Sequence, residues 1–164
     1  MEDFFCETSA TPTISEVNIP ANSFSIPGFI SENDLAAYRE KISAAYRSGI
    51  RHFKIAHWHG FELLKNYDDI KIHTEFPLPV CNSRSAALLH SLGASSAMYA
   101  PELETAELAA LQKHSPIPIT AASGKIPLLV SRIPLKPGKW RDRDGNSYTV
   151  MTKDGISEFY IKKN

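Results

Sequence analysis

Cys81 is the residue whose position most readily indicates a nucleophile. It ends an apolar stretch that begins at Leu78, and Asn82 or Ser83 directly after it can cap a helix. A thiol at the N-terminus of a helix has a lowered pKa, so its thiolate can attack an electrophile. The alternative is a small buried residue at a strand end, which we favour because no histidine is obviously placed as its base.

Glu102 and Arg132 are two charged side chains that we expect at the ends of predicted strands. Glu102 follows Pro101 at a junction of strand and helix, so its carboxylate can face a cleft or interact with the helix dipole in the first turn. Arg132 ends a strand predicted over 128–131, which would place its guanidinium at the mouth of the sheet, suited to a carboxylate or phosphate. A salt bridge from Arg132 to Asp142 or to Glu102 is the structural alternative.

Four histidines in one stretch of the chain raise the question of a metal site. His57 and His59 flank Trp58, and His52 and His73 are nearby. If a strand continues through His57 and His59, their side chains point to opposite sides. No carboxylate motif of a known metalloenzyme accompanies them. We therefore expect no metal and interpret these residues as surface or hydrogen-bonding histidines.

Alternating strand and helix patterns would have to position these residues. Helices are predicted from Ser31 to Gly49, over 60–66, from Asn82 or Ser83 to Gly93, and from Pro101 to about Lys113. Strands are predicted over 50–56, 70–76, 97–100, 117–120 and 128–131. This alternation predicts an α/β fold with a mostly parallel sheet, either a partial (β/α) barrel or an open sheet.

The composition divides the chain into three regions. Residues 1–29 are rich in Ser, Thr and Pro, so we expect an extended lead-in. Residues 30–135 should form the α/β body. Residues 136–164 should form an antiparallel β-hairpin appendage, because Asp144 and Gly145 supply the positive φ values of a tight turn.

Charge and cysteine content narrow the classes of function. Lys plus Arg equals Asp plus Glu at 18 each, so no overall charge favours nucleic acid or an anionic membrane, while a local basic patch stays open. The N-terminus lacks a signal peptide's basic region, and no long apolar run follows, so we expect a cytoplasmic protein that does not enter a membrane. Two cysteines are too few for a disulfide framework or a structural zinc site, so we expect free thiols and no cofactor.

Four segments carry the most distinctive pattern when they are taken in order. They read LPVCNS over 78–83, LGASSAMYAPEL over 92–103, SGKIPLLVSRIPL over 123–135 and RDRDG over 141–145. Over roughly residues 51–150 this pattern resembles the collagenase-like peptidase family of unassigned catalytic type, peptidase family U-32. Ser123 stands where that family usually has His, and Ile133 where it usually has Cys.

The resemblance implies a (β/α) barrel, which in complete form needs about 250 residues. A part of such a barrel would expose sheet edges and apolar faces, which implies a second copy or a complementary protein chain as partner. Family members related to RNA hydroxylation and ubiquinone synthesis hold a four-cysteine iron–sulfur cluster with ligands near Ile133. No cysteine occurs in residues 133–144, so we expect no cluster here.

Two hypotheses about function follow. The first is a split or degenerate peptidase of the U-32 type, with Cys81, Glu102 and Arg132 as candidate catalytic residues. Hydrolysis is implied by the resemblance alone, because the sequence contains no recognisable serine, cysteine, aspartic or metal protease motif. The second is a noncatalytic binding or assembly module that contacts RNA or a partner protein.

Overall fold

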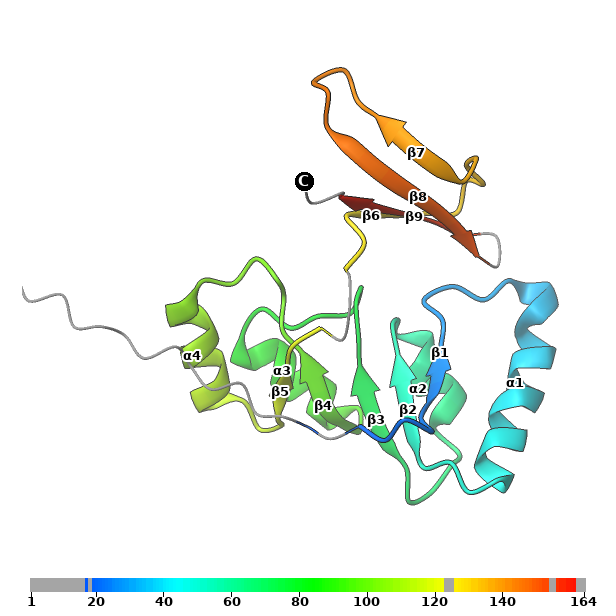
Figure 1. The fold of residues 1–164 in the computed structure, drawn as a ribbon. Helices are drawn as coiled ribbons and strands as arrows, with labels where there is room; N and C mark the ends of the chain where they lie inside the picture. The colour runs from blue at the N-terminus through cyan, green and yellow to red at the C-terminus, as the bar shows by residue number, and fades with distance from the viewer. Residues whose placement is uncertain (1–16, 18, 123–125, 154–155, 162–164) are drawn as a thin grey trace, which may run out of the picture. The chain divides into compact units, whose positions relative to one another are not determined.

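The structure is a computed structural model that describes residue 17 and residues 19–122, 126–153 and 156–161. The chain divides into two compact units, an N-terminal unit over residues 1–122 and a C-terminal unit over residues 123–164. Each unit contains a β-sheet of its own (Figure 1). Among the described residues, no helix is long and apolar enough to cross a membrane.

The N-terminal unit contains a parallel sheet whose strands follow one another in sequence order (Figure 1). Its strands are β1 (Phe24–Ile26), β2 (His52–Ile55), β3 (Lys71–Thr74), β4 (Ala94–Met98) and β5 (Ile119–Thr120). The helices between them are α1 (Glu32–Arg47), α2 (His59–Leu64), α3 (Ser83–Ser91) and α4 (Thr105–His114). The predicted α/β fold is confirmed. The strand order never reverses, unlike that of a doubly wound sheet, and is the order found in a (β/α) barrel wall.

Short polar residues and glycines set the ends of the helices as predicted. The Ser31 hydroxyl accepts a hydrogen bond from the backbone N–H of Asp34 at 3.2 Å and thereby caps α1. Asn82 caps α3 in the same way. Gly49 after α1 and Gly93 after α3 have φ values of 91° and 95°, which glycine adopts without steric cost. Each helix can therefore turn into the next strand within a few residues.

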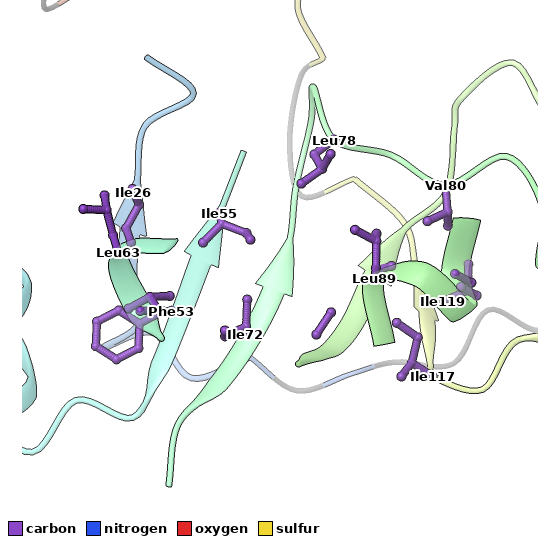
Figure 2. Close-up of a cluster of buried hydrophobic side chains, with 14 of the residues drawn as sticks. Ile26, Phe53, Ile55, Leu63, Ile72, Leu78, Val80, Leu89, Ile117 and Ile119 are labelled. Carbon is purple, nitrogen blue, oxygen red and sulfur yellow. The ribbon is translucent and has the colours of Figure 1, made fainter. Parts of the chain in front are cut away.

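One hydrophobic core joins the four helices to one face of the parallel sheet. Phe53 and Ile55 of β2 are completely buried, and Figure 2 shows them with Leu63 of α2 and Leu89 of α3 in the same cluster. The helices contribute Ile42, Ala45, Leu63, Leu64, Ala86, Leu89, Leu108 and Leu111 to it. Right-handed crossovers between consecutive parallel strands place every helix on the same side of a sheet. The opposite face therefore carries the alternate side chains of the strands.

Gly60 allows α2 to approach β2, so a side chain at this position should destabilise the N-terminal unit. A Cβ added to Gly60 would lie 2.6 Å from Cγ2 and 2.7 Å from Cβ of Ile55. We expect Gly60→Ala to lower the free energy of unfolding by about 1–3 kcal/mol, the usual cost of overpacking a core. Gly28→Ala is the matched control, because its added Cβ would meet no atom closer than 3.6 Å. Urea denaturation followed by circular dichroism measures both, and equal midpoints would contradict the close packing of α2 on β2.

The C-terminal unit is a four-stranded antiparallel sheet. Its strands are β6 (Leu129–Ser131), β7 (Gly138–Arg141), β8 (Ser147–Lys153) and β9 (Ile156–Ile161), arranged in the order β6-β9-β8-β7. Val150 and Ser157 are buried in it, and the Ser157 hydroxyl accepts a hydrogen bond from the backbone N–H of Leu135 at 2.9 Å. Gly145 between β7 and β8 has a φ of 86°. The positive φ predicted for Gly145 is confirmed, whereas Asp144 does not have a positive φ.

The strand predicted over 128–131 exists, but it belongs to the C-terminal sheet. β6 pairs antiparallel with β9, with Leu129 opposite Phe159, so its assignment as the fifth strand of the parallel sheet is wrong. Leu129 and Val130 are 52% and 39% exposed, whereas a strand inside a parallel sheet is buried on both faces. An apolar run indicates a strand without indicating its partner, and the fifth parallel strand is β5.

Candidate functional site

Polar side chains occupy the face of the parallel sheet that lies opposite the hydrophobic core. The register places Lys54 of β2 beside His73 of β3, and His73 beside Ser96 of β4. His52 and Glu75 share this face, because residues two apart in a strand point the same way. We call His52, Lys54, His73, Glu75 and Ser96 the polar row.

His73 is at the centre of the polar row and is hydrogen-bonded through both ring nitrogens. Its Nδ1 lies 2.7 Å from Oγ of Ser96, and its Nε2 lies 3.0 Å from Nδ1 of His52. The two imidazole rings are stacked, with planes 7° apart. Two arrangements of protons fit these distances. Either Ser96 donates to His73 and His73 donates to His52, or each hydrogen bond runs in the reverse direction. The three side chains can therefore act as a proton relay.

Burial sets the protonation state of this relay. Burial, followed by the positive charges of His52, Lys54 and Lys71, lowers the pKa of His73 from 6.5 to about 4. The pKa of His52 is also lowered, first by burial and then by Lys71. His73 is therefore neutral at pH 7. A neutral imidazole can accept a proton from a serine hydroxyl, which is the action of a general base.

An ion pair lies beside the relay, toward the carboxyl ends of the strands. Nζ of Lys54 is 3.1 Å from Oε1 of Glu75, and the two side chains are 20% and 31% exposed. The pair balances the charge of Lys54 next to His73. Partly exposed pairs contribute about 0–1 kcal/mol to stability, so this pair matters more for the charge of the polar row than for the fold.

His57 and His59 lie beyond the carboxyl end of β2, where barrel enzymes place catalytic groups. Their Nδ1 atoms are 3.1 Å apart, so they do not take the opposite orientations expected for a strand that continues through both. The reason is that β2 ends at Ile55 and the chain turns into α2. Burial lowers the pKa of His59, and His57 lowers it further.

These two histidines could supply two ligands to a metal ion, whereas a tetrahedral zinc site needs about four. In residue 17 and residues 19–122, 126–153 and 156–161, no group of three or more His, Cys, Asp and Glu is placed to hold a metal.

The predicted residues Cys81 and Glu102 lie in neighbouring loops of the N-terminal unit. Val80 and Tyr99 form a parallel bridge, which brings together the loops that follow β3 and β4. Within the described part of the chain, no hydrogen bond or ion pair joins Cys81 to Glu102. Cys81 is exposed, so its interpretation as a buried residue is wrong, and its assignment as a nucleophile stays a prediction.

The expected placements of Glu102 and Arg132 also need correction. Glu102 lies ahead of α4, because Glu104 caps this helix and Glu107 accepts a hydrogen bond from the Glu104 backbone N–H at 3.0 Å. Glu102 is therefore outside the first helical turn. Arg132 follows β6, a strand of the C-terminal sheet, so it does not end a strand of the parallel sheet as expected. Cys81 and Glu102 belong to the N-terminal unit and Arg132 to the C-terminal unit, so their grouping into one catalytic site stays a prediction.

Ser96 and the relay that it forms with two histidines are not among the residues predicted from the sequence. A detectable signal was present, because polar residues alternate with apolar ones in His52–Ile55. Strands of a parallel sheet are commonly apolar on both faces. Polar residues on one face therefore indicate that this face does not pack against the hydrophobic core. The strand that contains Ser96 shows no comparable alternation of polar and apolar residues, since Ala94–Met98 contains small residues on both faces.

No family model matches the chain, and neither a curated protein nor a solved structure matches it.

Proposed function

We propose that the chain is a binding and assembly module whose N-terminal unit is a sector of a (β/α) barrel wall. The strand order of the parallel sheet is the observation that carries this proposal. A closed, filled barrel needs about eight strands. Among the described residues, β1 pairs with β2 alone and β5 pairs with β4 alone. Within this part of the chain, both edges of the sheet therefore present backbone groups that can pair with another chain.

The polar row supports the same proposal. Side chains on the face opposite the helices fill the interior of a closed barrel. His73 and Ser96 are only 2% and 1% exposed and are hydrogen-bonded to each other, as polar groups in an enclosed interior must be. The resemblance to peptidase family U-32 also implies a barrel.

Light scattering over a dilution series tests this proposal. The chain has a mass of 18.2 kDa, and we expect a larger mass at high concentration that falls toward 18.2 kDa on dilution. A complementary chain that remains bound through purification would give a constant larger mass of two components, which would also support assembly. A mass of 18.2 kDa at every concentration, with no bound chain, would contradict it.

Peptide hydrolysis is the second candidate function, and the relay of Ser96, His73 and His52 favours it. In such a reaction Oγ of Ser96 would attack the peptide carbonyl carbon while its proton moved to Nδ1 of His73, the atom 2.7 Å away. That proton would then pass to the leaving amine as the C–N bond broke, and water would hydrolyse the acyl group from Ser96. His52 would then hold the ring of His73 in position. Ser96 is 1% exposed, so a substrate would have to enter the interior face of the sheet.

Hydrolysis of fluorescein-labelled gelatin tests the second candidate. We expect Ser96→Ala to abolish hydrolysis and Ser95→Ala to retain it, since the neighbouring Ser95 is a serine of the same strand outside the relay. Activity should also rise through the pKa of His73, at about pH 4. Equal activity of the two variants, or no hydrolysis by the unmodified chain, would exclude the relay as a peptidase site.

A further inference from the structure

Positive charge is concentrated in the C-terminal unit, although the whole chain is neutral. Residues 123–164 contain nine Lys and Arg but four Asp and Glu, a formal charge of +5. Residues 1–122 contain nine Lys and Arg but fourteen Asp and Glu, a formal charge of −5. A small unit with this excess of positive charge attracts polyanions. The neutral total therefore does not describe the surface of the C-terminal unit.

A hollow of about 390 Å³ lies at the hairpin of β7 and β8, on the edge of the C-terminal sheet. It is lined by Lys139, Trp140, Arg141, Ser147 and Tyr148. Trp140 is directly opposite Tyr148 in the register, so the two rings lie on one face of the hairpin. Lys139 and Arg141 flank Trp140 along the edge strand β7, so they line the hollow from the other face of this strand. The hollow thus combines two aromatic rings with two cations.

Hydrogen bonds and ring packing hold the two aromatic side chains in place. Nε1–H of Trp140 donates to the carbonyl of Lys136 at 2.9 Å, and the indole meets Phe159 edge-on, with ring centroids 6.3 Å apart. The Tyr148 hydroxyl donates to Oδ2 of Asp142 at 2.8 Å. Trp140 nevertheless remains 41% exposed. A side chain that is both fixed and exposed loses little conformational entropy when a ligand stacks on it.

The two cations of the hollow are not neutralised by nearby carboxylates. In the part of the chain that the structure describes, neither Lys139 nor Arg141 forms an ion pair. The adjacent carboxylate of Asp142 instead accepts hydrogen bonds from the backbone N–H and the side-chain amide of Asn146, both at 2.8 Å, and from Tyr148. The charges of Lys139 and Arg141 therefore remain available to a ligand.

We propose that this hollow binds single-stranded nucleic acid, an inference that rests on the proposed role of the chain as a binding module. Phosphates would contact Lys139 and Arg141, and a base would stack on the exposed ring of Trp140, next to Tyr148. This combination of cations and aromatic rings is how proteins hold single strands, with each stacked base contributing about 1–3 kcal/mol. A duplex keeps its bases stacked on one another, so it would gain the phosphate contacts without the stacking. The aromatic rings therefore favour a single strand over a duplex or an acidic protein.

Fluorescence anisotropy of the full chain with labelled oligonucleotides of about 12 nucleotides tests the inference, because single-strand sites span about 4–16 nucleotides. Oligouridylate and oligothymidylate distinguish RNA from DNA, and tighter binding of either one supports the site. Lys139→Gln with Arg141→Gln should weaken binding by about tenfold and reduce the slope of log K against log salt by about 1.4. Arg39→Gln with Arg84→Gln removes the same charge from exposed positions of α1 and α3 and should leave binding unchanged.

Tryptophan fluorescence provides the second measurement. The chain has two tryptophans, so Trp58→Phe leaves Trp140 as the reporter, and a bound single strand should quench its emission by stacking. The inference is overturned if the double variant of Arg39 and Arg84 weakens binding as much as the double variant of Lys139 and Arg141. It is also overturned if a duplex or polyglutamate binds as tightly as the single strand, or if the emission of Trp140 is not quenched. Neither measurement depends on the solution mass, so this inference and the assembly proposal can fail separately.

Discussion

Leu89→Ala should lower the free energy of unfolding of the N-terminal unit by about 2–5 kcal/mol, the usual cost of removing a buried leucine side chain. Leu89 is 2% exposed and belongs to the core between α3 and the parallel sheet (Figure 2). Removal of the leucine side chain leaves a cavity that surrounding side chains fill incompletely. Denaturation in urea, followed by far-ultraviolet circular dichroism, measures the effect.

Leu88 provides a matched control for Leu89 in the same helix. It is 51% exposed, so Leu88→Ala should change the free energy of unfolding by about 0.5 kcal/mol or less. Both substitutions replace leucine with alanine at adjacent positions of α3, so helix propensity contributes equally to the two. A larger loss for Leu88→Ala than for Leu89→Ala would mean that α3 presents the opposite face to the sheet.

Acidification from pH 6.5 to pH 4 should destabilise the N-terminal unit by about 3 kcal/mol through His73 alone, at 1.36 kcal/mol for each pH unit. The pKa of His73 is lowered in the folded state from 6.5 to about 4. Between these two values the unfolded chain binds a proton that the folded chain excludes. Stability is therefore retained above pH 6.5 and falls as the pH approaches 4.

The free energy of unfolding, measured by urea denaturation at several pH values, checks this prediction. His73→Gln should remove most of the loss between pH 6.5 and pH 4, because glutamine does not titrate. His90→Gln at the exposed end of α3 should keep the pH dependence of the unmodified chain. If His73→Gln retains the same dependence, the acid sensitivity arises elsewhere and His73 is not the buried neutral group described here.

Local features of the fold could be predicted because they depend on residues close in sequence. Ser31 and Asn82 cap α1 and α3 through hydrogen bonds to backbone groups three residues away. Gly145 supplies a positive φ because the turn between β7 and β8 requires it. The alternation of strands and helices likewise predicted the parallel sheet, since each crossover is formed by one continuous segment.

Pairing between distant segments could not be predicted in the same way. β6 pairs with β9, and nothing in the apolar run over 128–131 distinguishes this partner from a neighbour in the parallel sheet. His57 and His59 converge because β2 ends two residues before His57, and element boundaries are uncertain from sequence by about that much. The relay of His52, His73 and Ser96 depends on the register of three strands, which a single sequence does not determine.

The opposite charges of the two units could not be predicted from the charge of the whole chain. A net charge of zero gave no reason to expect binding of nucleic acid. Once the boundary between residues 122 and 123 is known, the same counts describe an acidic unit and a basic one. The basic hollow lined by Lys139 and Arg141 could therefore be recognised only after the two units were separated.

Hydrogen–deuterium exchange at the two edges of the parallel sheet tests the central claim most directly, namely that the N-terminal unit is a barrel-wall sector that assembles through its edge strands. Exchange should be measured for peptides covering β1, β3 and β5 at low and high protein concentration. We predict that amides of β1 and β5 exchange more slowly at high concentration, because pairing with another chain protects them. Amides of β3, which already pair on both sides, should exchange at the same rate throughout. The claim of assembly through edge strands would be contradicted if exchange in β1 and β5 did not depend on concentration. This holds for a chain that has a mass of 18.2 kDa and carries no bound partner.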